Sequence, residues 1–577
     1  MTTDHRERLL SGLVAVVATA LFFGVRWQFM TGEAATWGLN SDTAIFGLMA
    51  RELVEGEGFP MFFWGQNYMG PLTSWVTAAV SVVFSWFGVS EPVLGFPADT
   101  YVVPPTALRL VASVQMFLGN ILFWAASRRL FGSRTAAGLL ILLCYWGPPV
   151  IFRNSLRPLG AEAAYFLGAL ILYLFVRNIF DSLRGKFALG LLIGFSWWIN
   201  QTIVFVLLPI LFYWLAPTEM YRKVRSWAWI VDSVLLRRYP EFRGKSALQA
   251  LNGLLVLVSV SGIAIAAMGG LRTEVFGVSL KIPDGISTMR DGVLGLVLVQ
   301  AILALYFGTV SLRRAWKSFP EVRYLLAGAA LGYSPVILGW IFDWYPKSFG
   351  ASFKLLSIEQ LIPHLLQTVP GAIPEWLGSL PGHENAVLIF ALVTLGAFVW
   401  LNRAQVFSYV VLKSRRYPKE SVFWGILFFS FLYFLVGHRN ESGPIRYLIL
   451  ALPVAYGGLM VGLESIWTRW KQGWLPATAL FAALLFYLSN LGATQAEWVR
   501  DQRFSGSAIE AIRDAGYSLC VASYWDSYRL EYLSDKNLRF IPMTGERVPG
   551  VSRARRLEPG PKCAYLGDGQ VLPLSGE

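Results

Sequence analysis

Two acidic residues stand where the chain emerges from predicted membrane spans. Asp42 follows the first apolar span, and Glu162 begins a later span after a short polar loop. A carboxylate can take a proton from a hydroxyl group as a general base, and acidic side chains at a membrane are costly unless they are used or paired. Asp42 is therefore a candidate general base at the bilayer surface, and Glu162 a second acid that orients a substrate.

Both acids also have a structural interpretation. Asp42, or its neighbour Ser41, stands where a side chain caps the helix that follows. Glu162 stands at the start of a helix, where negative charge is favoured, and Arg153 or Arg157 in the preceding loop could be its ion-pair partner. The sequence leaves these interpretations open beside the chemical ones.

Further polar residues are predicted on the same side of the membrane. His438, Arg439 and Arg446 precede a late apolar segment. The two arginines either pair with Glu441 or hold a lipid phosphate through bidentate hydrogen bonds. Gln201 follows two tryptophans at the end of a span, so it is a weaker substrate-binding candidate beside an aromatic interface belt.

The composition places these residues in a membrane protein. The chain has 577 residues, is 55% hydrophobic and 15% charged, and has a mean hydropathy of +0.50. Soluble proteins contain about 25% charged residues. The net charge of +13 comes from Lys and Arg that collect in alternate loops, which is typical of membrane topology and contact with anionic lipids. Nucleic acid is not expected as a partner.

The apolar stretches predict a polytopic α-helical membrane protein with about thirteen transmembrane helices. The basic loops put the N-terminus in the cytoplasm and the C-terminus outside it, in a plasma membrane of the bacterial inner-membrane type. Residues 1–491 form the transmembrane domain. The predicted spans cover residues 9–29, 107–127, 135–152, 162–177, 187–201, 202–216, 249–269, 292–311, 323–342, 385–402, 420–437, 446–463 and 474–491.

The first external loop, residues 30–106, is unusually long. It contains a predicted helix over 43–55 and an apolar helix over 71–87. If 71–87 crossed the membrane, the basic residues at 128–134 would face outward, against the positive-inside rule. We therefore expect two helices that lie along the outer interface, with Asp42 at the start of the first.

The polar tail, residues 492–577, predicts a small extracytoplasmic α/β domain. A helix is expected over 507–515, and strands over 519–522, 538–541 and 562–566. Cys520 and Cys563 lie in two of these strands and are either disulfide-bonded or buried as free thiols. The sequence has no set of Cys and His residues with metal-ligand spacing, so a divalent cation held by the acids is left open and no other cofactor is expected.

These features together resemble the membrane glycosyltransferases of the C-type superfamily. The resemblance is to protein O-mannosyltransferases, to the lipid A aminoarabinose transferase and to similar bacterial glycosyltransferases. It rests on the two loop acids, the long first external loop, the external C-terminal segment and five short motifs. The motifs are Leu108-Arg109-Leu110, Arg128-Arg129-Leu130-Phe131-Gly132, Arg446-Tyr447-Leu448, the segment Trp64–Gly70 and the segment Tyr524–Tyr528.

The resemblance implies transfer of a sugar from a polyprenyl-phosphate donor to an acceptor hydroxyl, with inversion at the anomeric carbon. Asp42 then matches the catalytic acid of the first loop, and Gln66 and Tyr68 join the substrate-binding candidates. Mannosyltransferases have Asp-Glu at this position, whereas Asp42 is followed by Thr43, which leaves the acceptor (glycan, lipid or protein) and any metal dependence undetermined.

Two other classes of protein fit a polytopic chain. A transporter or lipid flippase would have charges or broken helices at the bilayer midplane and an internal repeat, and the sequence contains neither. A non-catalytic scaffold that presents its external tail would not need the polar clusters to meet at one site.

Overall fold

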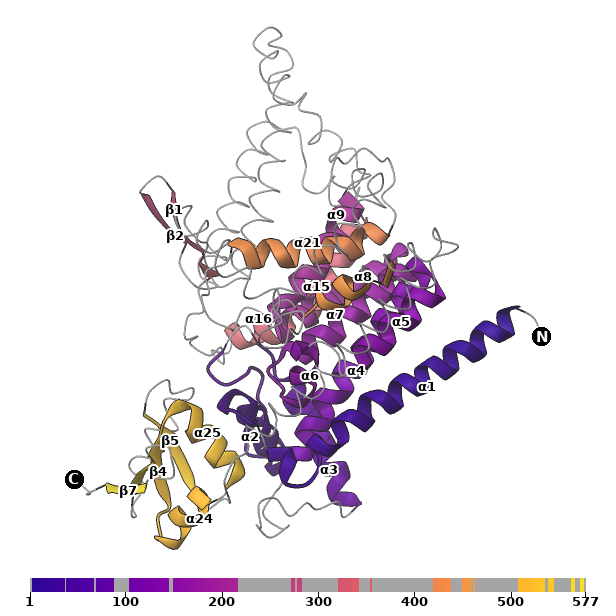
Figure 1. Cartoon of the computed structure of the whole chain (residues 1–577). Coiled ribbons are helices and arrows are strands. Elements are labelled where there is room, and N and C mark those ends of the chain that lie inside the picture. Colours follow the sequence, from indigo (N-terminus) through magenta and orange to yellow (C-terminus); the bar gives the residue numbers. More distant parts are fainter. Residues whose placement is uncertain are drawn as a thin grey trace.

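The computed structural model is a helical body with a small sheet at one end (Figure 1). It describes residues 3–36, 38–66, 69–87, 103–144, 149–215, 271–275, 278–282, 320–341, 353–354, 419–436, 449–457, 460–461, 507–534, 538–543, 562–565 and 571–574. The predicted spans at 249–269, 292–311, 385–402 and 474–491, and part of that at 446–463, lie outside these residues.

Long apolar helices form the body. Their bounds are α1 Thr3–Met30, α4 Pro105–Phe131, α5 Ser133–Cys144, α6 Pro149–Leu156, α7 Ala161–Val176, α8 Leu183–Ile199, α9 Val204–Leu215 and α21 Glu420–Val436. Two described helices, Leu9–Met30 within α1 and the whole of α4, are long and apolar enough to cross a membrane. Large apolar side chains such as Leu13 and Val16 are exposed on α1, which is the surface expected of a helix in contact with lipid.

Two predicted spans are divided in the structure. The stretch 135–152 contributes to two helices, α5 and α6, rather than one. The stretch 323–342 forms α15 (Pro320–Gly332) and α16 (Ser334–Ile341), with a break at Tyr333. Pro335 has no backbone N–H to donate, so a continuous helix cannot pass through this point with its hydrogen bonds intact.

Helix α15 packs against α8 through glycines on both helices. A Cβ atom on Gly194 would lie 2.7 Å from the backbone nitrogen of Tyr333, and one on Gly328 would lie 2.8 Å from that of Leu191. Gly190 and Gly332 repeat the arrangement one turn away, with backbone atoms of the facing helix at similarly short range. The two helices therefore meet backbone to backbone, as small residues spaced four apart allow in membrane helices.

The helices separate the two acidic loops from the basic loops. Helices α4 and α7 run in the same direction. Thr73 contacts Gln115 of α4 and Glu162 of α7, and further along both helices Asn120 accepts a hydrogen bond from Tyr165 at 2.7 Å. Both helices end in basic sequence, with Arg128 and Arg129 in the last turn of α4 and Arg177 capping α7.

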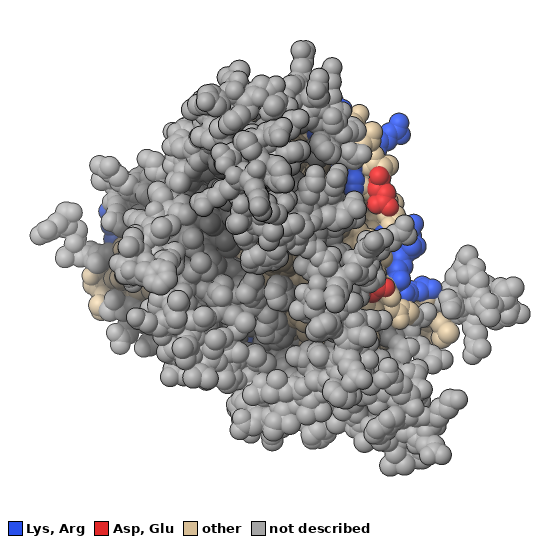
Figure 2. Space-filling model, turned by 90° about the horizontal axis from the view of Figure 1, so that it is seen from above, with Lys and Arg blue, Asp and Glu red and all other residues tan. Residues whose placement is uncertain are grey.

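Lys419 marks the same basic end, just before α21. Its ammonium donates to the carbonyl oxygens of Phe175 (3.1 Å) and Val176 (3.3 Å), the last carbonyls of α7, where a cation is favoured. Seen from the top of Figure 1, most of the visible charged side chains of the described residues lie along one edge of the molecule (Figure 2). The basic residues at the ends of α4 and α7 thus lie at the end of these helices away from the second loop, whereas most of the predicted basic loops fall outside the described residues.

The first loop contains the two expected helices, α2 (Ser41–Glu55) and α3 (Leu72–Trp86). Helix α3 buries a polar stripe of Thr73, Thr77 and Ser81, in which Thr77 and Ser81 each donate to the carbonyl four residues earlier. Its far end exposes Trp86 and Phe87. The helix is present as predicted, and its placement along the membrane surface stays a prediction.

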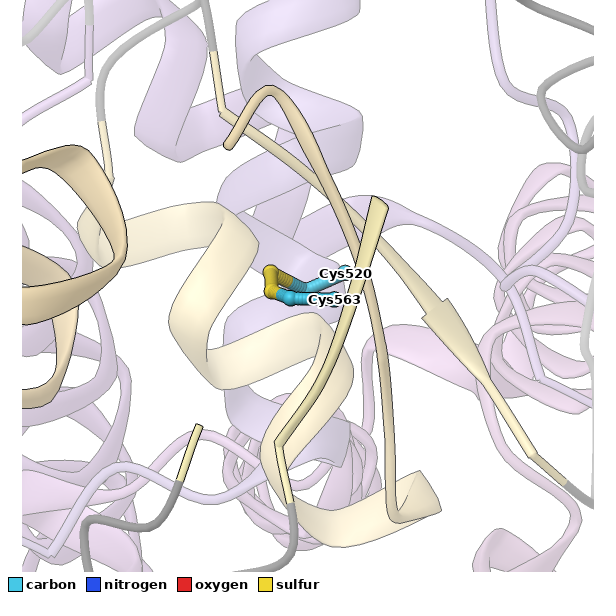
Figure 3. The surroundings of a disulfide bond; sticks show 2 residues. All are labelled: Cys520 and Cys563. Atoms are coloured by element: carbon cyan, nitrogen blue, oxygen red, sulfur yellow. A yellow bond between two sulfur atoms is a disulfide. The ribbon is translucent and has the colours of Figure 1, made fainter. Parts of the chain in front are cut away.

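A four-stranded sheet forms in the C-terminal tail. Its order is β5-β4-β6-β7, with β4, β5 and β6 parallel and β7 antiparallel. The elements are α24 Ser507–Asp514, β4 Leu519–Ala522, α25 Tyr524–Leu533, β5 Arg539–Pro542, β6 Lys562–Tyr565 and β7 Val571–Leu574. Cys520 and Cys563 are register partners on β4 and β6 and form a disulfide (Figure 3). The sequence had left this pairing open.

The tail shares its core with the first loop. Buried side chains from α2, such as Phe46 and Met49, belong to the same hydrophobic cluster as Leu530 and Phe540 of the tail. The ring of Tyr532 lies against Gly47, where a Cβ would come within 2.9 Å of the ring. The tail is therefore seated on α2.

A second, three-stranded sheet was not predicted. Strands β1 (Leu271–Val275) and β2 (Val278–Ile282) pair antiparallel, and β3 (Phe353–Lys354) pairs parallel with β1. Val275 pairs with Val278, so only two residues connect the first two strands. The only local signal in the sequence is a glycine between two short runs that contain β-branched residues, which is a weak indication of a hairpin because Phe-Gly is not one of the usual turn pairs.

Candidate functional site

Asp42 lies in the first turn of α2 and does not cap it. Asn40 is the capping residue, because its side-chain oxygen accepts a hydrogen bond from the backbone N–H of Thr43 at 2.9 Å. The Ser41 hydroxyl is also engaged elsewhere, donating to the carbonyl oxygen of Tyr524 at 2.5 Å. The predicted cap at Asp42 or Ser41 is therefore wrong, and the half-buried Asp42 carboxylate does not serve as the helix cap.

The Asp42 carboxylate is bound by the C-terminal tail. The phenol of Tyr524 donates a hydrogen bond to Asp42 Oδ1 at 2.6 Å, across 482 residues of sequence. A bond of this length to a carboxylate is typical of the stronger, charge-assisted class. Asp42 therefore has a fixed orientation at the junction of the first loop and the tail.

The second loop lies directly against the start of α2. Thr43 Oγ1 donates to the carbonyl oxygen of Pro158 at 3.2 Å, and Arg157 Nε donates to that of Gly38 at 2.7 Å. Burial lowers the pKa of the Arg157 guanidinium to about 10, the nearby Arg153 lowers it as well, and the negative charge of Asp42 acts in the opposite direction. Arg157 thus carries its positive charge at neutral pH, within electrostatic reach of Asp42.

Glu162 is fully buried beneath this loop. Its Oε1 accepts from Thr73 Oγ1 (2.9 Å) and from the backbone N–H of Gly160 (3.2 Å), and its Oε2 accepts from the N–H of Leu159 (3.1 Å). The carboxylate therefore joins α3 to the loop that precedes α7. This position makes Glu162 a brace for the loop that contacts Asp42, and it holds the side chain away from solvent.

The first loop, the second loop and the end of α8 meet around Gly160. Asn200 Nδ2 donates to the carbonyl oxygen of Gly160 at 3.1 Å, and Met69 forms an isolated antiparallel bridge with Asn200. Gly160 adopts a left-handed conformation (φ 82°), and a Cβ there would meet Asn200 Nδ2 at 3.5 Å and the Met69 thioether at shorter range. A glycine is required here by both conformation and space.

Two of the substrate-binding candidates lie close to this junction. Gln66 is buried, and its backbone N–H donates to the carbonyl oxygen of Phe63 at 2.9 Å in the turn that leads to Met69. Gln201 is half-buried in the short helix that follows Asn200. The structure thus brings Asp42, Glu162, Gln66 and Gln201 to one end of the helical body.

The remaining candidates lie outside the described residues. These are Tyr68, His438, Arg439 and Arg446. Within the part of the chain that is described, no group of three or more His, Cys, Asp or Glu side chains is arranged to hold a metal ion. Asp42 and Glu162 are two acids and so fall below that number, and the divalent cation that the sequence left open stays untested. Both Glu162 oxygens accept hydrogen bonds, from Thr73 and from two backbone amides.

Sequence reasoning missed the residues that connect the segments. The sequence indicates Tyr524 only as part of a motif and Ser41 only as a helix cap, and it gives Asn40 and Asn200 no role. Asn40 was detectable, since Asn is as good a helix cap as Asp or Ser. The bonds of Tyr524 and Asn200 join segments that are distant in sequence, and no local pattern predicts them.

Comparisons with known proteins give no match to a family model and none to a curated protein. Solved structures of membrane glycosyltransferases are similar to the chain at low identity. An oligosaccharyltransferase from Archaeoglobus fulgidus, solved with zinc and sulfate, has 13% identity and a TM-score of 0.46 over 92% of this chain and 62% of its own. The chain therefore spans less than two thirds of that protein.

Two further solved structures are similar. The oligosaccharyltransferase AglB from Archaeoglobus fulgidus, in complex with an inhibitory peptide and a dolichol-phosphate, has 12% identity and a TM-score of 0.45 over 97% of this chain and 69% of its own. ArnT from Cupriavidus metallidurans, bound to undecaprenyl phosphate, has 14% identity and a TM-score of 0.37 over 97% of this chain and 93% of its own. Likenesses this distant carry no argument about activity, which has to come from the site.

Proposed function

We propose that this protein is a membrane glycosyltransferase that uses a polyprenyl-phosphate-linked sugar as donor. The acceptor is a hydroxyl group of a glycan, lipid or protein at the extracytoplasmic face. The observation that carries the proposal is the position of Asp42, a half-buried carboxylate that is not needed as a helix cap and is fixed by a bond from the opposite end of the chain. The resemblance of the two loop acids and five motifs to the C-type glycosyltransferases supplies the reaction class.

Asp42 is the general base in this proposal. The acceptor oxygen forms a bond to the anomeric carbon from the face opposite the donor phosphate. The bond from that carbon to the phosphate oxygen breaks, its electron pair leaves with the polyprenyl phosphate, and the acceptor proton passes to the Asp42 carboxylate. The configuration at the anomeric carbon is inverted.

The leaving phosphate needs positive charge close to it. Arg439 and Arg446 are the candidates from the sequence, with His438 beside them. Arg157 is a charged guanidinium of the described site within electrostatic reach of Asp42. Gln66, Tyr68 and Gln201 are proposed as hydrogen-bonding partners of the sugar or the acceptor.

The topology in this proposal has thirteen spans, with the basic loops in the cytoplasm. The end that carries Asp42 and the C-terminal tail then faces outward, where a disulfide between Cys520 and Cys563 is stable. A bacterial inner membrane fits this arrangement. Residues 492–577 form the extracytoplasmic tail, although its core includes side chains of α2.

The competing class is a transporter or flippase, and a scaffold is the third. Polar side chains of the described residues gather at the loop end, around Asp42 and Gly160, where a transferase site is proposed. Asn120 is also buried between the helices, but its amide is bonded to Tyr165 and to the carbonyl oxygen of Leu143. A non-catalytic scaffold would not require the first loop, the second loop and the tail to meet at one place.

Purified protein in detergent, incubated with a panel of radiolabelled polyprenyl-phosphate hexoses and membrane extract, tests the function. We expect transfer of label from at least one donor to acceptor material, with release of polyprenyl phosphate in equal amount. A protein that moves an intact labelled lipid across vesicles and never releases polyprenyl phosphate would be a flippase instead.

A further inference from the structure

The C-terminal tail supplies a residue to the site of the first loop. We infer that Tyr524, at the start of α25, is a positioning residue that fixes the orientation of the Asp42 carboxylate, so that the tail completes the active site. This inference rests on the proposed function and adds a role for the tail, which the sequence indicated only as an external domain.

Two hydrogen bonds hold Tyr524 against the first turn of α2. Its phenol donates to Asp42 Oδ1 at 2.6 Å, and its carbonyl oxygen accepts from the Ser41 hydroxyl at 2.5 Å. Side chain and backbone of the same residue thus contact two consecutive residues of α2. This arrangement defines both the position of Tyr524 and the direction of its hydroxyl group.

The start of α25 is itself well defined. Ser523 caps the helix, with its side-chain oxygen accepting from the backbone N–H of Asp526 at 3.2 Å. The ring of Tyr524 packs edge-on against that of Tyr528, with 5.6 Å between centroids. The phenol therefore projects from a capped helix terminus, which suits a group that has to hold another side chain in place.

The rest of α25 lies along the first loop and keeps Tyr524 in register. The Tyr532 phenol donates to the carbonyl oxygen of Val103 at 3.1 Å, and Glu531 lies 3.9 Å from the Arg51 guanidinium of α2. Both contacts join the tail to the first loop without involving Asp42. They supply matched controls for the experiment.

A fixed carboxylate is a better base than a mobile one. Rotation of the Asp42 side chain would place its oxygens out of line with the acceptor hydroxyl, and small misalignments in a site are costly in rate. Tyr524 limits this rotation by holding Oδ1. It does not touch the reacting atoms in this account, so its removal should lower the rate and leave substrate binding largely intact.

The first experiment measures the contact without any assay of activity. Thermal unfolding of the full-length protein is compared for Asp42→Ala, Tyr524→Phe and the double variant. We expect the unfolding temperature of the double variant to fall no further than that of the more destabilised single variant, because both changes remove the same bond. Additive losses would show that the bond is absent in solution and would overturn the inference.

The second experiment measures turnover with the labelled polyprenyl-phosphate hexose that the wild type uses. Tyr524→Phe should lower kcat by about tenfold to a hundredfold, as loss of a bond to a charged group predicts, with little change in the KM of the donor. Tyr532→Phe removes a phenol bond at the same interface and should leave kcat unchanged while lowering the unfolding temperature. Equal losses of kcat in both variants would mean that the tail acts only through stability.

Different outcomes would contradict the proposed function and the positioning role of Tyr524. If the wild type transfers no sugar, the proposed function is wrong. If the wild type transfers sugar and Asp42→Asn retains full turnover, the function stands and Asp42 is not the general base. In both cases the role of Tyr524 falls as well. If Asp42→Asn is inactive and Tyr524→Phe turns over like the wild type, only the positioning role is wrong.

Discussion

At the scale of single residues, hydrogen bonds decide what each acid can do. Asn40 caps α2, so the Asp42 side chain is not needed as the helix cap. The hydrogen bond from Tyr524 fixes the orientation of the Asp42 carboxylate. Glu162 is in the opposite situation, because both of its oxygens accept bonds inside the protein. The two acids that look equivalent in the sequence therefore have different surroundings.

Replacing Glu162 with Gln tests its role as a brace. The amide NH2 of Gln would face N–H donors or the Thr73 hydroxyl, so at least one buried bond is lost. We expect the free energy of unfolding to fall by about 1–3 kcal/mol, measured by thermal or chemical unfolding in detergent. Glu510→Gln is the control, since Glu510 is an exposed acid in the first turn of another helix and should have almost no effect. If the two variants are equally stable, Glu162 does not stabilise the loop before α7.

At the scale of elements, helix packing positions the loops. Helix α8 ends at Asn200, which ties the second loop in place, and α8 is itself held against α15 by glycines. The positions of most helices could be predicted, because hydropathy and length specify them locally. The break at Tyr333 and the division of the 135–152 stretch were missed because hydropathy alone was followed, although Pro148, Pro149 and Pro335 mark both points in the sequence.

A side chain at the α8–α15 contact should separate the two helices. Gly194→Val would place methyl groups against the backbone of Ala329 and Tyr333, and overpacking of this kind costs about 1–3 kcal/mol. We expect a lower unfolding temperature. We also expect a smaller loss of turnover, because a displaced α8 would shift Asn200 and the second loop that it binds. Gly24→Val is the control, because a Cβ on Gly24 meets no atom within 4 Å. A similar loss in both variants would point to helix propensity instead of packing.

At the scale of the whole molecule, distant segments build the site together. The first loop, the second loop, the end of α8 and the tail meet at one end, and the described basic residues at the end of α7 lie at the other. Strand β7 was not predicted, whereas the other three described strands of the tail were predicted from short apolar runs in a polar segment. Their seating on α2 was not, because it depends on a shared core of side chains hundreds of residues apart.

Cysteine labelling in intact cells tests the sidedness of the molecule. Phe87 is exposed after α3, and Ile179 is exposed between α7 and α8 at the basic end. The account predicts that Phe87→Cys reacts with a membrane-impermeant maleimide added outside, whereas Ile179→Cys reacts only after the membrane is opened. The native cysteines are a buried thiol and a disulfide, so background labelling should be low. If Phe87→Cys does not react with the maleimide added outside, α3 crosses the membrane and the predicted sidedness of all later loops is reversed.

Turnover of Asp42→Asn tests the central claim most directly. The wild type, Asp42→Asn and Asp181→Asn are compared with the labelled polyprenyl-phosphate sugar that the wild type uses, after equal unfolding temperatures have been established. Asp181 is the control acid, since it lies in the short 3-10 helix between α7 and α8 at the basic end. We expect kcat of Asp42→Asn to fall by about 10²- to 10⁴-fold, as loss of a general base predicts, and Asp181→Asn to match the wild type. Near-normal turnover of Asp42→Asn would contradict the account.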